Sequence, residues 1–245
     1  MRSIILIIFS ICFIPNIHAQ IYEVGAFLGG SNFIGDVGRT NYIAPNSTAG
    51  GLLFKWNRSP RHSYRASVIL SQLKANDKDT NDARRQSRNF SFENTIVEIS
   101  AGMEFTFLDF DLHSMDPQFT PYLYTGISTA RHKIYYFNQQ ANIRNTTTTY
   151  PSFDNNYNWA FGIPMALGFK ATVGGGFILA AEIGVRYTFS DKIDSSDPGI
   201  FTPNPIPGDP PSLVPFGNKN SNDWYVFSGI TLTYTFGQKP CYCYY

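Results

Sequence analysis

Hydrophobic and polar residues alternate along two segments in the second half of the chain, 159–170 and 177–190. In the later segment one face is wholly apolar, whereas the other face carries Glu182 and Arg186. Successive side chains of a β-strand point to opposite faces, so both segments are predicted to be strands. Between them, residues 173–176 read Val-Gly-Gly-Gly and tolerate the positive φ of a tight turn. The pattern therefore predicts a β-hairpin.

Three features of this hairpin favour a membrane-spanning sheet over a soluble one. About 12 steps of ~3.3 Å, tilted by ~45°, span roughly 28 Å, which is close to the apolar band of a barrel wall. Aromatic residues bracket that band, with Phe177 at one end and Tyr187 and Phe189 at the other, as in the interfacial girdles of membrane barrels. The charges lie on the face that a barrel turns inward. We therefore expect two strands of an outer-membrane β-barrel.

Alternating segments recur along the rest of the chain and predict further strands at about 21–30, 48–57, 62–75, 90–109, 119–137 and 223–237. The inward face of 119–137 is the least clear. An even number of strands lets the first and last pair antiparallel, which removes exposed sheet edges. After Gln20 no apolar run is long enough for a spanning helix, so a membrane protein must span by strands. The predicted fold class is all-β, an eight-stranded antiparallel transmembrane β-barrel of outer-membrane type.

The connections between the expected strands alternate between long and short. The long ones are 31–47, 76–89, 138–156 and 191–222, and the short ones are 57–61, 109–118 and 173–176. Outer-membrane barrels have short periplasmic turns and long external loops, so both chain ends are expected in the periplasm. Acidic residues dilute the basic ones in 76–89, which indicates a solvated loop rather than a nucleic-acid site. Six prolines between Pro198 and Pro211 are expected to exclude regular strand from 191–222.

Charged residues on the minority face of the strands are expected to lie inside the barrel. They are four acids and four bases, namely Glu23, Lys55, Arg65, Glu98, Glu104, Lys170, Glu182 and Arg186. Eight strands enclose a space that side chains can just fill, so we interpret these residues as a charge-paired plug. A conducting pore would need a wider channel. A soluble lipocalin-like barrel would turn its apolar face inward around a ligand and its polar face outward.

The amino terminus has the pattern of a secretory signal peptide, with a basic start, an apolar run at 4–14 and Ala19 before the expected cut. Pro15 comes too soon for the ~20 apolar residues of a spanning helix. We predict a signal peptide at 1–19, the barrel at 20–237 and a periplasmic tail at 238–245. The expected location is the cell outer membrane, with its lipid as a partner. The formal net charge of +1 argues against nucleic acid.

Cys241 and Cys243 lie in the tail, which would enter the oxidising periplasm. One residue apart, they are too close for a comfortable mutual bridge, because alternate side chains of an extended chain diverge. One hypothesis is that one or both form a disulfide with a periplasmic partner. The other is a frayed tail with idle thiols or a strained local bridge. Two cysteines alone make an incomplete metal site, and neither a metal nor a cofactor is predicted.

Catalysis would need a Ser, a His and an acid near one rim. His132 and Ser128 lie on one expected strand, yet no acid is paired with them by spacing, so the chain is predicted not to be an enzyme. Asp36 and Arg39 follow the first expected strand. We expect either a salt bridge that stabilises this loop, or a loop that folds over the barrel mouth or contacts another export component.

The segments 25–43 and 49–57 resemble the PorG family of outer-membrane barrels of the type IX secretion system, and 184–191 and 229–237 look similar too. The most specific part is Gly-Asp-Val-Gly-Arg-Thr at 35–40. The resemblance implies a non-enzymatic component of the protein secretion machinery that associates with a periplasmic ring of a PorK-like lipoprotein and a PorN-like protein. In some bacteria this machinery also serves gliding. The main alternative is a passive structural or adhesive barrel in the manner of OmpA.

Overall fold

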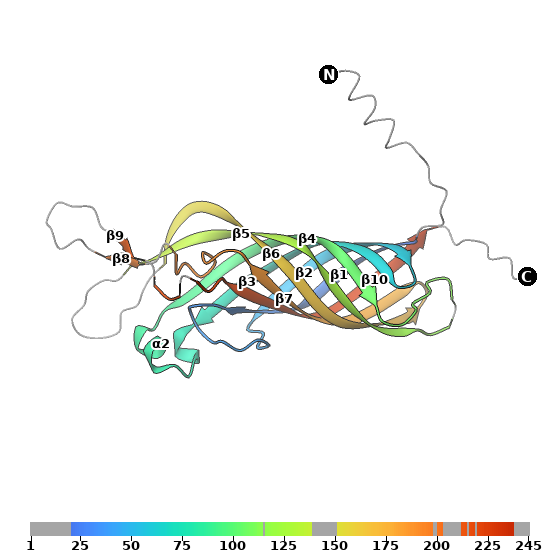
Figure 1. Ribbon diagram of the computed structural model, residues 1–245, viewed down its shortest axis with the longest axis horizontal. Helices are drawn as coiled ribbons and strands as arrows, with labels where there is room; N and C mark the ends of the chain where they lie inside the picture. The colour runs from blue at the N-terminus through green and yellow to red at the C-terminus, as the bar shows by residue number, and fades with distance from the viewer. Residues whose placement is uncertain are drawn as a thin grey trace, which may run out of the picture.

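The computed structural model describes residues 21–114, 116–138, 151–197, 200–202, 212–214, 216–218 and 220–237, which form one antiparallel barrel (Figure 1). Its long strands are β1 (Ile21–Ile34), β2 (Ser47–Ser59), β3 (His62–Asn76), β4 (Ser91–Thr106), β5 (Phe119–Asn138), β6 (Pro151–Gly174), β7 (Phe177–Thr188) and β10 (Trp224–Gly237). Neighbours in this series pair antiparallel, and Ile21 of β1 lies opposite Gly237 of β10. The wall is therefore closed, and the predicted eight-stranded barrel is confirmed.

One predicted boundary differs clearly from the structure. The strand expected from Trp159 begins at Pro151, so most of the second half of the predicted loop 138–156 is strand. β5 and β6 continue past the other strands at one end of the barrel (Figure 1). Backbone groups of a hairpin satisfy one another in water as well as in lipid. The ladder therefore extends beyond the segment in which hydrophobic alternation signals it.

Inward and outward side chains alternate along the wall as predicted. On β2, Leu52 is 68% exposed and Lys55 is 2% exposed, and on β5 the outward Ile127 is 73% exposed. Apolar side chains thus face outward and charged side chains face inward, which is the reverse of a soluble barrel. An exposed apolar surface that encircles a closed wall is the surface that hydrocarbon covers in outer-membrane barrels.

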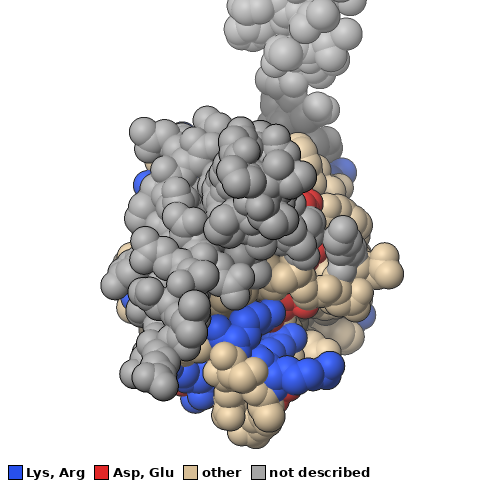
Figure 2. Space-filling view, turned by 90° about the vertical axis from the view of Figure 1, so that its left-hand side faces the viewer, with Lys and Arg blue, Asp and Glu red and all other residues tan. Residues whose placement is uncertain are grey.

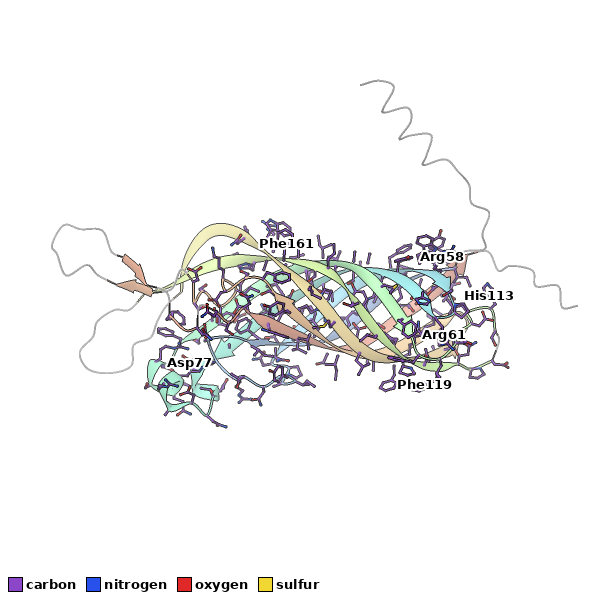
Figure 3. All side chains as sticks on the ribbon, in the orientation of Figure 1. Arg58, Arg61, Asp77, His113, Phe119 and Phe161 are labelled. Atoms are coloured by element: carbon purple, nitrogen blue, oxygen red, sulfur yellow. The ribbon has the colours of Figure 1, made fainter. Side chains whose placement is uncertain are left out.

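Aromatic side chains gather outside the wall at both ends. At the end that holds Ile21, the rings of Phe119 and Phe169 stack with centroids 5.6 Å apart. At the opposite end, the rings of Tyr187 and Trp224 pack at 4.8 Å. In Figure 3, Phe119 and Phe161 point outward at opposite ends of the wall. These two groups form the pair of aromatic girdles expected where a barrel leaves the bilayer.

The short turns after β2, β4 and β6 lie at one end of the barrel, and the connections after β1, β3, β5 and β7 lie at the other (Figure 1). The loop lengths identify the first end as periplasmic and the second as external. At the periplasmic end, Gly174, Gly175 and Gly176 all have positive φ in the turn after β6. Among the residues described, no helix is long and apolar enough to cross a membrane.

Two external connections are more ordered than predicted. In the stretch expected to be a solvated loop, η1 (Asp77–Asp79) and α2 (Ala83–Arg88) form, and Asp77 is fully buried. In the connection expected to hold no strand, β8 (Ile200–Thr202) and β9 (Ser212–Val214) pair with each other. These two strands lie between the prolines, where no missing N–H interrupts the ladder.

The first external loop folds back over the outside of the wall. The side-chain amide of Asn32 donates to the carbonyl oxygens of Asn41 and Tyr42, both at 3.2 Å. Asn32 lies opposite Val226 in the sheet. Val226 alternates in step with Trp224, which predicts an outward side chain, but it is fully buried. This patch of the outer surface is therefore covered by protein rather than by lipid.

The external half of the barrel interior holds an apolar cluster that the sequence pattern did not separate from the charged plug. Strand residues of the cluster include Phe33, Leu53, Ile69, Leu73, Phe92, Ile96 and Phe227. Two external connections add Val37 and Ile193, which are fully buried in the same cluster. The barrel is therefore sealed at its external mouth by its own loops.

Candidate functional site

Charged side chains fill the periplasmic half of the barrel interior. Glu104 on β4 lies between two lysines, with its carboxylate oxygens 2.8 Å from Nζ of Lys55 on β2 and 2.8 Å from Nζ of Lys170 on β6. Lys55 Nζ is also 3.9 Å from Glu23 on β1. Glu23 accepts hydrogen bonds from the Asn57 amide at 2.9 Å and from the hydroxyl of a threonine on β10 at 2.8 Å.

A second group of charges lies further along the axis. Arg65 on β3 donates two hydrogen bonds to Glu182 on β7, of 2.6 and 2.8 Å, in a bidentate pair. The Tyr122 hydroxyl donates to the same carboxylate at 2.6 Å. The Arg65 guanidinium also lies 4.8 Å from the ring centre of Tyr124. The Glu182 carboxylate therefore accepts from both terminal nitrogens of Arg65 and from the Tyr122 hydroxyl.

The third pair reaches the border of the apolar cluster. Nε of Arg186 on β7 lies 3.3 Å from Glu98 on β4. The Tyr225 hydroxyl donates to Glu98 at 2.6 Å, and the guanidinium lies 4.6 Å from the ring centre of Phe227. Nη1 and Nη2 of Arg186 have no hydrogen-bond partner among the described residues.

All eight charged residues expected inside the barrel lie there, and none is more than 4% exposed. Among these eight residues, the salt bridges at 3.3 Å or less join strands that are not neighbours in the sheet, so they cross the lumen rather than run along the wall. A water-filled channel would leave these side chains exposed. Tyr122, Tyr124 and Tyr225 were missed at the sequence level, because aromatic residues on both faces of their strands hid the alternation.

The external rim ties together loops that are far apart in sequence. Asp36 and Arg39 do not pair with each other. The Asp36 backbone N–H donates to Asp194 at 2.9 Å, and its carboxylate accepts from the backbone N–H of Asn218 at 3.0 Å. Arg39 instead donates to the carbonyl oxygen of Asp79 at 2.9 Å. The guanidinium of Arg39 also lies 3.9 Å from the Asp79 carboxylate, so the salt bridge at this loop joins it to the next external connection rather than to Asp36. Each of the two residues links its loop to another.

Asp77 anchors the helical connection to this rim. Its carboxylate accepts hydrogen bonds from the Gly38 and Phe90 backbone N–H groups and from the Arg88 guanidinium, at 2.8 to 3.1 Å. Arg88 also donates to the Asp36 carbonyl oxygen at 2.7 Å. Figure 2, which looks onto the external end, shows Lys and Arg gathered at its lower part, where α2 lies. Figure 3 shows Asp77 at the base of this region.

Three aspartates lie together beside the sealed mouth. Asp191 follows β7, Asp223 directly precedes β10, and Asp194 lies in the buried segment between them. Burial, and then the charges of Asp194 and Asp36, raise the pKa of Asp191 to about 7. Burial also raises the pKa of Asp194 and of Asp223. The sequence did not single out this group, because Asp191 and Asp194 begin the longest connection, whereas Asp223 follows its other end.

The residues considered for catalysis do not form a triad. Ser128 and His132 are both buried on the inward face of β5. Nδ1 of His132 lies 3.2 Å from the Lys133 carbonyl oxygen rather than near a carboxylate. His113 lies at the periplasmic rim (Figure 3). Cys241, Cys243 and the expected signal peptide lie outside the described residues.

Comparisons with solved structures find other small membrane barrels. Neisserial surface protein A shares 12% identity over 89% of this chain and 97% of its own, with a TM-score of 0.43. The N-terminal β-barrel domain of Pseudomonas aeruginosa OprF shares 9% over 89% and 98%, with a TM-score of 0.42. A major outer membrane protein from Thermus thermophilus shares 14% over 89% and 100%, with a TM-score of 0.42.

A search of curated proteins for relatives finds no match. A family model does match, and it covers residues 2–245. The chain therefore belongs to the family described as Domain of unknown function (DUF6089).

Proposed function

We propose that this barrel is a non-enzymatic component of the type IX protein secretion machinery, anchored in the outer membrane and docked onto a periplasmic ring of PorK-like and PorN-like proteins. The non-enzymatic role is supported by the filled interior of the barrel. Ion pairs occupy its periplasmic half and an apolar cluster its external half. In the described part of the chain, these side chains occupy the lumen from one half to the other, so partners would meet the protein at its two ends.

The link to secretion is supported by the resemblance of residues 25–43 and 49–57 to PorG proteins. The segment Gly35–Thr40, the most specific part of that resemblance, is held by contacts to two other external loops through Asp36 and Arg39. A segment with such contacts is constrained for the stability of the rim. We therefore look to the other end of the barrel for a ring partner.

The periplasmic end offers a surface for docking. A hollow of about 640 Å³ lies between the turn after β4 and the turn after β6. Leu112, Val173 and Phe177 give it an apolar lining, and the glycines of the turn after β6 also line it. The tail with Cys241 and Cys243 follows β10, whose end lies at the same rim. A periplasmic protein that binds here would contact apolar side chains first and could then form a disulfide with the tail.

Affinity isolation of the full-length protein from gently solubilised envelopes tests this function. We expect PorK-like and PorN-like proteins to be recovered with the wild type and with Tyr42→Glu, a change at the external rim, where Tyr42 is 66% exposed. We expect Val173→Glu to lose them, because it introduces a charge into the hollow from a position that is 55% exposed. Recovery of the barrel alone from the wild type would support a passive structural or adhesive barrel instead.

A further inference from the structure

The aspartates beside the external mouth are brought together by the barrel wall. Each of Asp191, Asp194 and Asp223 has a carboxylate oxygen within 4.8 Å of one from each of the other two. The Asp223 backbone pairs with the end of β7, since its N–H donates to the Ser190 carbonyl at 2.9 Å and its carbonyl accepts from Thr188 at 3.1 Å. The β7–β10 ladder therefore holds two of the three carboxylates side by side.

Two oxygens of this group have no hydrogen-bond donor among the described residues. Asp194 accepts from the backbone N–H groups of Ser196 and Asp36, both at 2.9 Å. Asp223 uses one oxygen to accept from the Ile193 N–H at 2.8 Å, but its Oδ1 is unpartnered, although the side chain is fully buried. Asp191 Oδ1 is likewise buried and unpartnered. Buried acceptors are normally satisfied, so these two oxygens indicate a missing partner.

The group also lacks compensation for its charge. Within the part of the chain that the structure describes, no Lys or Arg forms a salt bridge with any of the three aspartates. Lys192, the adjacent base, lies 4.0 Å from Asp197 instead. Inside the barrel, by contrast, every acid faces a base. A buried cluster of carboxylates without a neighbouring base is stabilised when a cation binds between them.

We propose that Asp191, Asp194 and Asp223 bind a divalent cation, with Ca²⁺ preferred. The donors are oxygens only, which suits hard cations rather than Zn²⁺ or Cu²⁺. Mg²⁺ keeps several of its waters, whereas Ca²⁺ accepts irregular sets of carboxylates and carbonyls. Asp194 and Asp223 are fully buried and leave little room for retained water. Oxygens bound to one Ca²⁺ lie at most about 5 Å apart, which agrees with the observed spacing.

Gly35 gives this site a link to the first external loop. A Cβ at Gly35 would lie 2.7 Å from Asp223 Oδ1 and 2.5 Å from the ring of Phe33. A side chain at this position would therefore crowd the unpartnered oxygen. The next residue, Asp36, donates its N–H to Asp194. A bound cation would thus fix the first and last external loops against the barrel mouth.

Titration of the purified full-length barrel in detergent micelles tests the site. With CaCl₂ we expect one site per chain and a Kd of about 10⁻⁴–10⁻³ M, as in extracellular calcium modules, with weaker binding of MgCl₂. Terbium, which replaces Ca²⁺ and luminesces when a nearby indole is excited, should report the same site through Trp224, next to Asp223. Excess CaCl₂ should remove the signal, and Trp224→Phe should weaken it without weakening Ca²⁺ binding.

Matched variants separate this site from adventitious binding. Asp223→Asn is expected to weaken Ca²⁺ binding at least tenfold, whereas Asp79→Asn, at an exposed acid of the same rim, should leave it unchanged. Heat-modifiable electrophoretic mobility shows whether each variant is folded, and Asp194→Asn provides a second loss variant. The proposal is overturned if a calorimetric titration with CaCl₂ up to about 10 mM gives no heat of binding, or if Asp223→Asn binds Ca²⁺ as tightly as the wild type. Either result would leave the proposed role in secretion unaffected.

Discussion

Glu104 is the most sensitive position of the barrel interior. It is the only acid in the described part of the chain that lies within salt-bridge distance of two lysines, Lys55 and Lys170, both at 2.8 Å. Replacing Glu104 with Gln keeps the shape of the side chain and removes its charge. Lys170 is then left with the rings of Phe110 and Tyr122, at 4.7 and 5.9 Å. Lys55 retains Glu23 at 3.9 Å and the ring of Tyr122 at 5.5 Å.

The expected loss follows from burial. Removing one partner of a buried ion pair costs about 3–5 kcal/mol, because an uncompensated charge remains in a low-dielectric interior. The same strand offers a matched control, Glu93→Gln. Glu93 lies 3.3 Å from Lys74, but the two side chains are 53% and 42% exposed, so this exposed pair is worth about 0–1 kcal/mol. The two changes are thus expected to differ by about 3 kcal/mol, which is over 100-fold in the unfolding equilibrium.

Urea unfolding in lipid vesicles, followed by tryptophan fluorescence and far-UV circular dichroism, measures both variants. We expect a clear fall of the unfolding midpoint for Glu104→Gln and almost none for Glu93→Gln. Adding Lys170→Met to Glu104→Gln should recover much of the loss, because the remaining lysine, Lys55, still has the carboxylate of Glu23 at 3.9 Å. Equal stability of Glu104→Gln and Glu93→Gln would refute the assignment of the charges to a water-free interior.

Three further predictions concern the two ends and the lumen. In planar bilayers the wild type should show no steady conductance, because side chains fill its interior; a stable open level would contradict the sealed barrel. With a chelator present, the thermal stability of the rim should fall as the pH rises from 4 to 7. The pKa of Asp191 is 3.8 in the unfolded chain and about 7 in the folded rim, so the folded state holds this proton more tightly in that range. Asp191→Asn should flatten this dependence. Non-reducing electrophoresis of envelopes should show a mixed disulfide that Cys241→Ser with Cys243→Ser abolishes, and a wild type that stays monomeric would exclude the intermolecular bridge.

The wall of the barrel could be predicted from sequence because lipid imposes a simple rule. Side chains that face lipid must be apolar, so alternation is long and regular within the bilayer, as on β7, where Glu182 and Arg186 mark the inner face. The rule weakens where aromatic residues suit both faces. On β5, Tyr122 and Tyr124 point inward, where their hydroxyls donate hydrogen bonds to Glu182 on β7 and to a serine on β4. These partners explain the inward orientation, and they cannot be identified from the sequence of β5. The choice of partner for each charge was equally hidden, since it depends on which strands lie opposite.

The external rim could not be predicted because its contacts join distant residues of irregular sequence. The Asn218 backbone N–H donates to the Asp36 carboxylate at 3.0 Å, and no local sequence pattern connects the two residues. Asp77 looked like one acid among many in a polar stretch, yet it is buried and accepts from Gly38, Arg88 and Phe90. Solvated loops and buried loops share the same composition when the burying surface comes from elsewhere in the chain.

The ion pairs that cross the lumen bear on how the wall resists deformation. Arg65 and Glu182 lie on β3 and β7, which are opposite each other in the ring of strands, and Arg186 and Glu98 tie β7 to β4. Flattening the cylinder into an oval along or across this direction would change the distance between these strands and so strain the ion pairs. A rigid, round cross-section changes little when the surrounding bilayer thins or comes under tension. Such a barrel can hold a large neighbouring assembly at a constant position in the membrane.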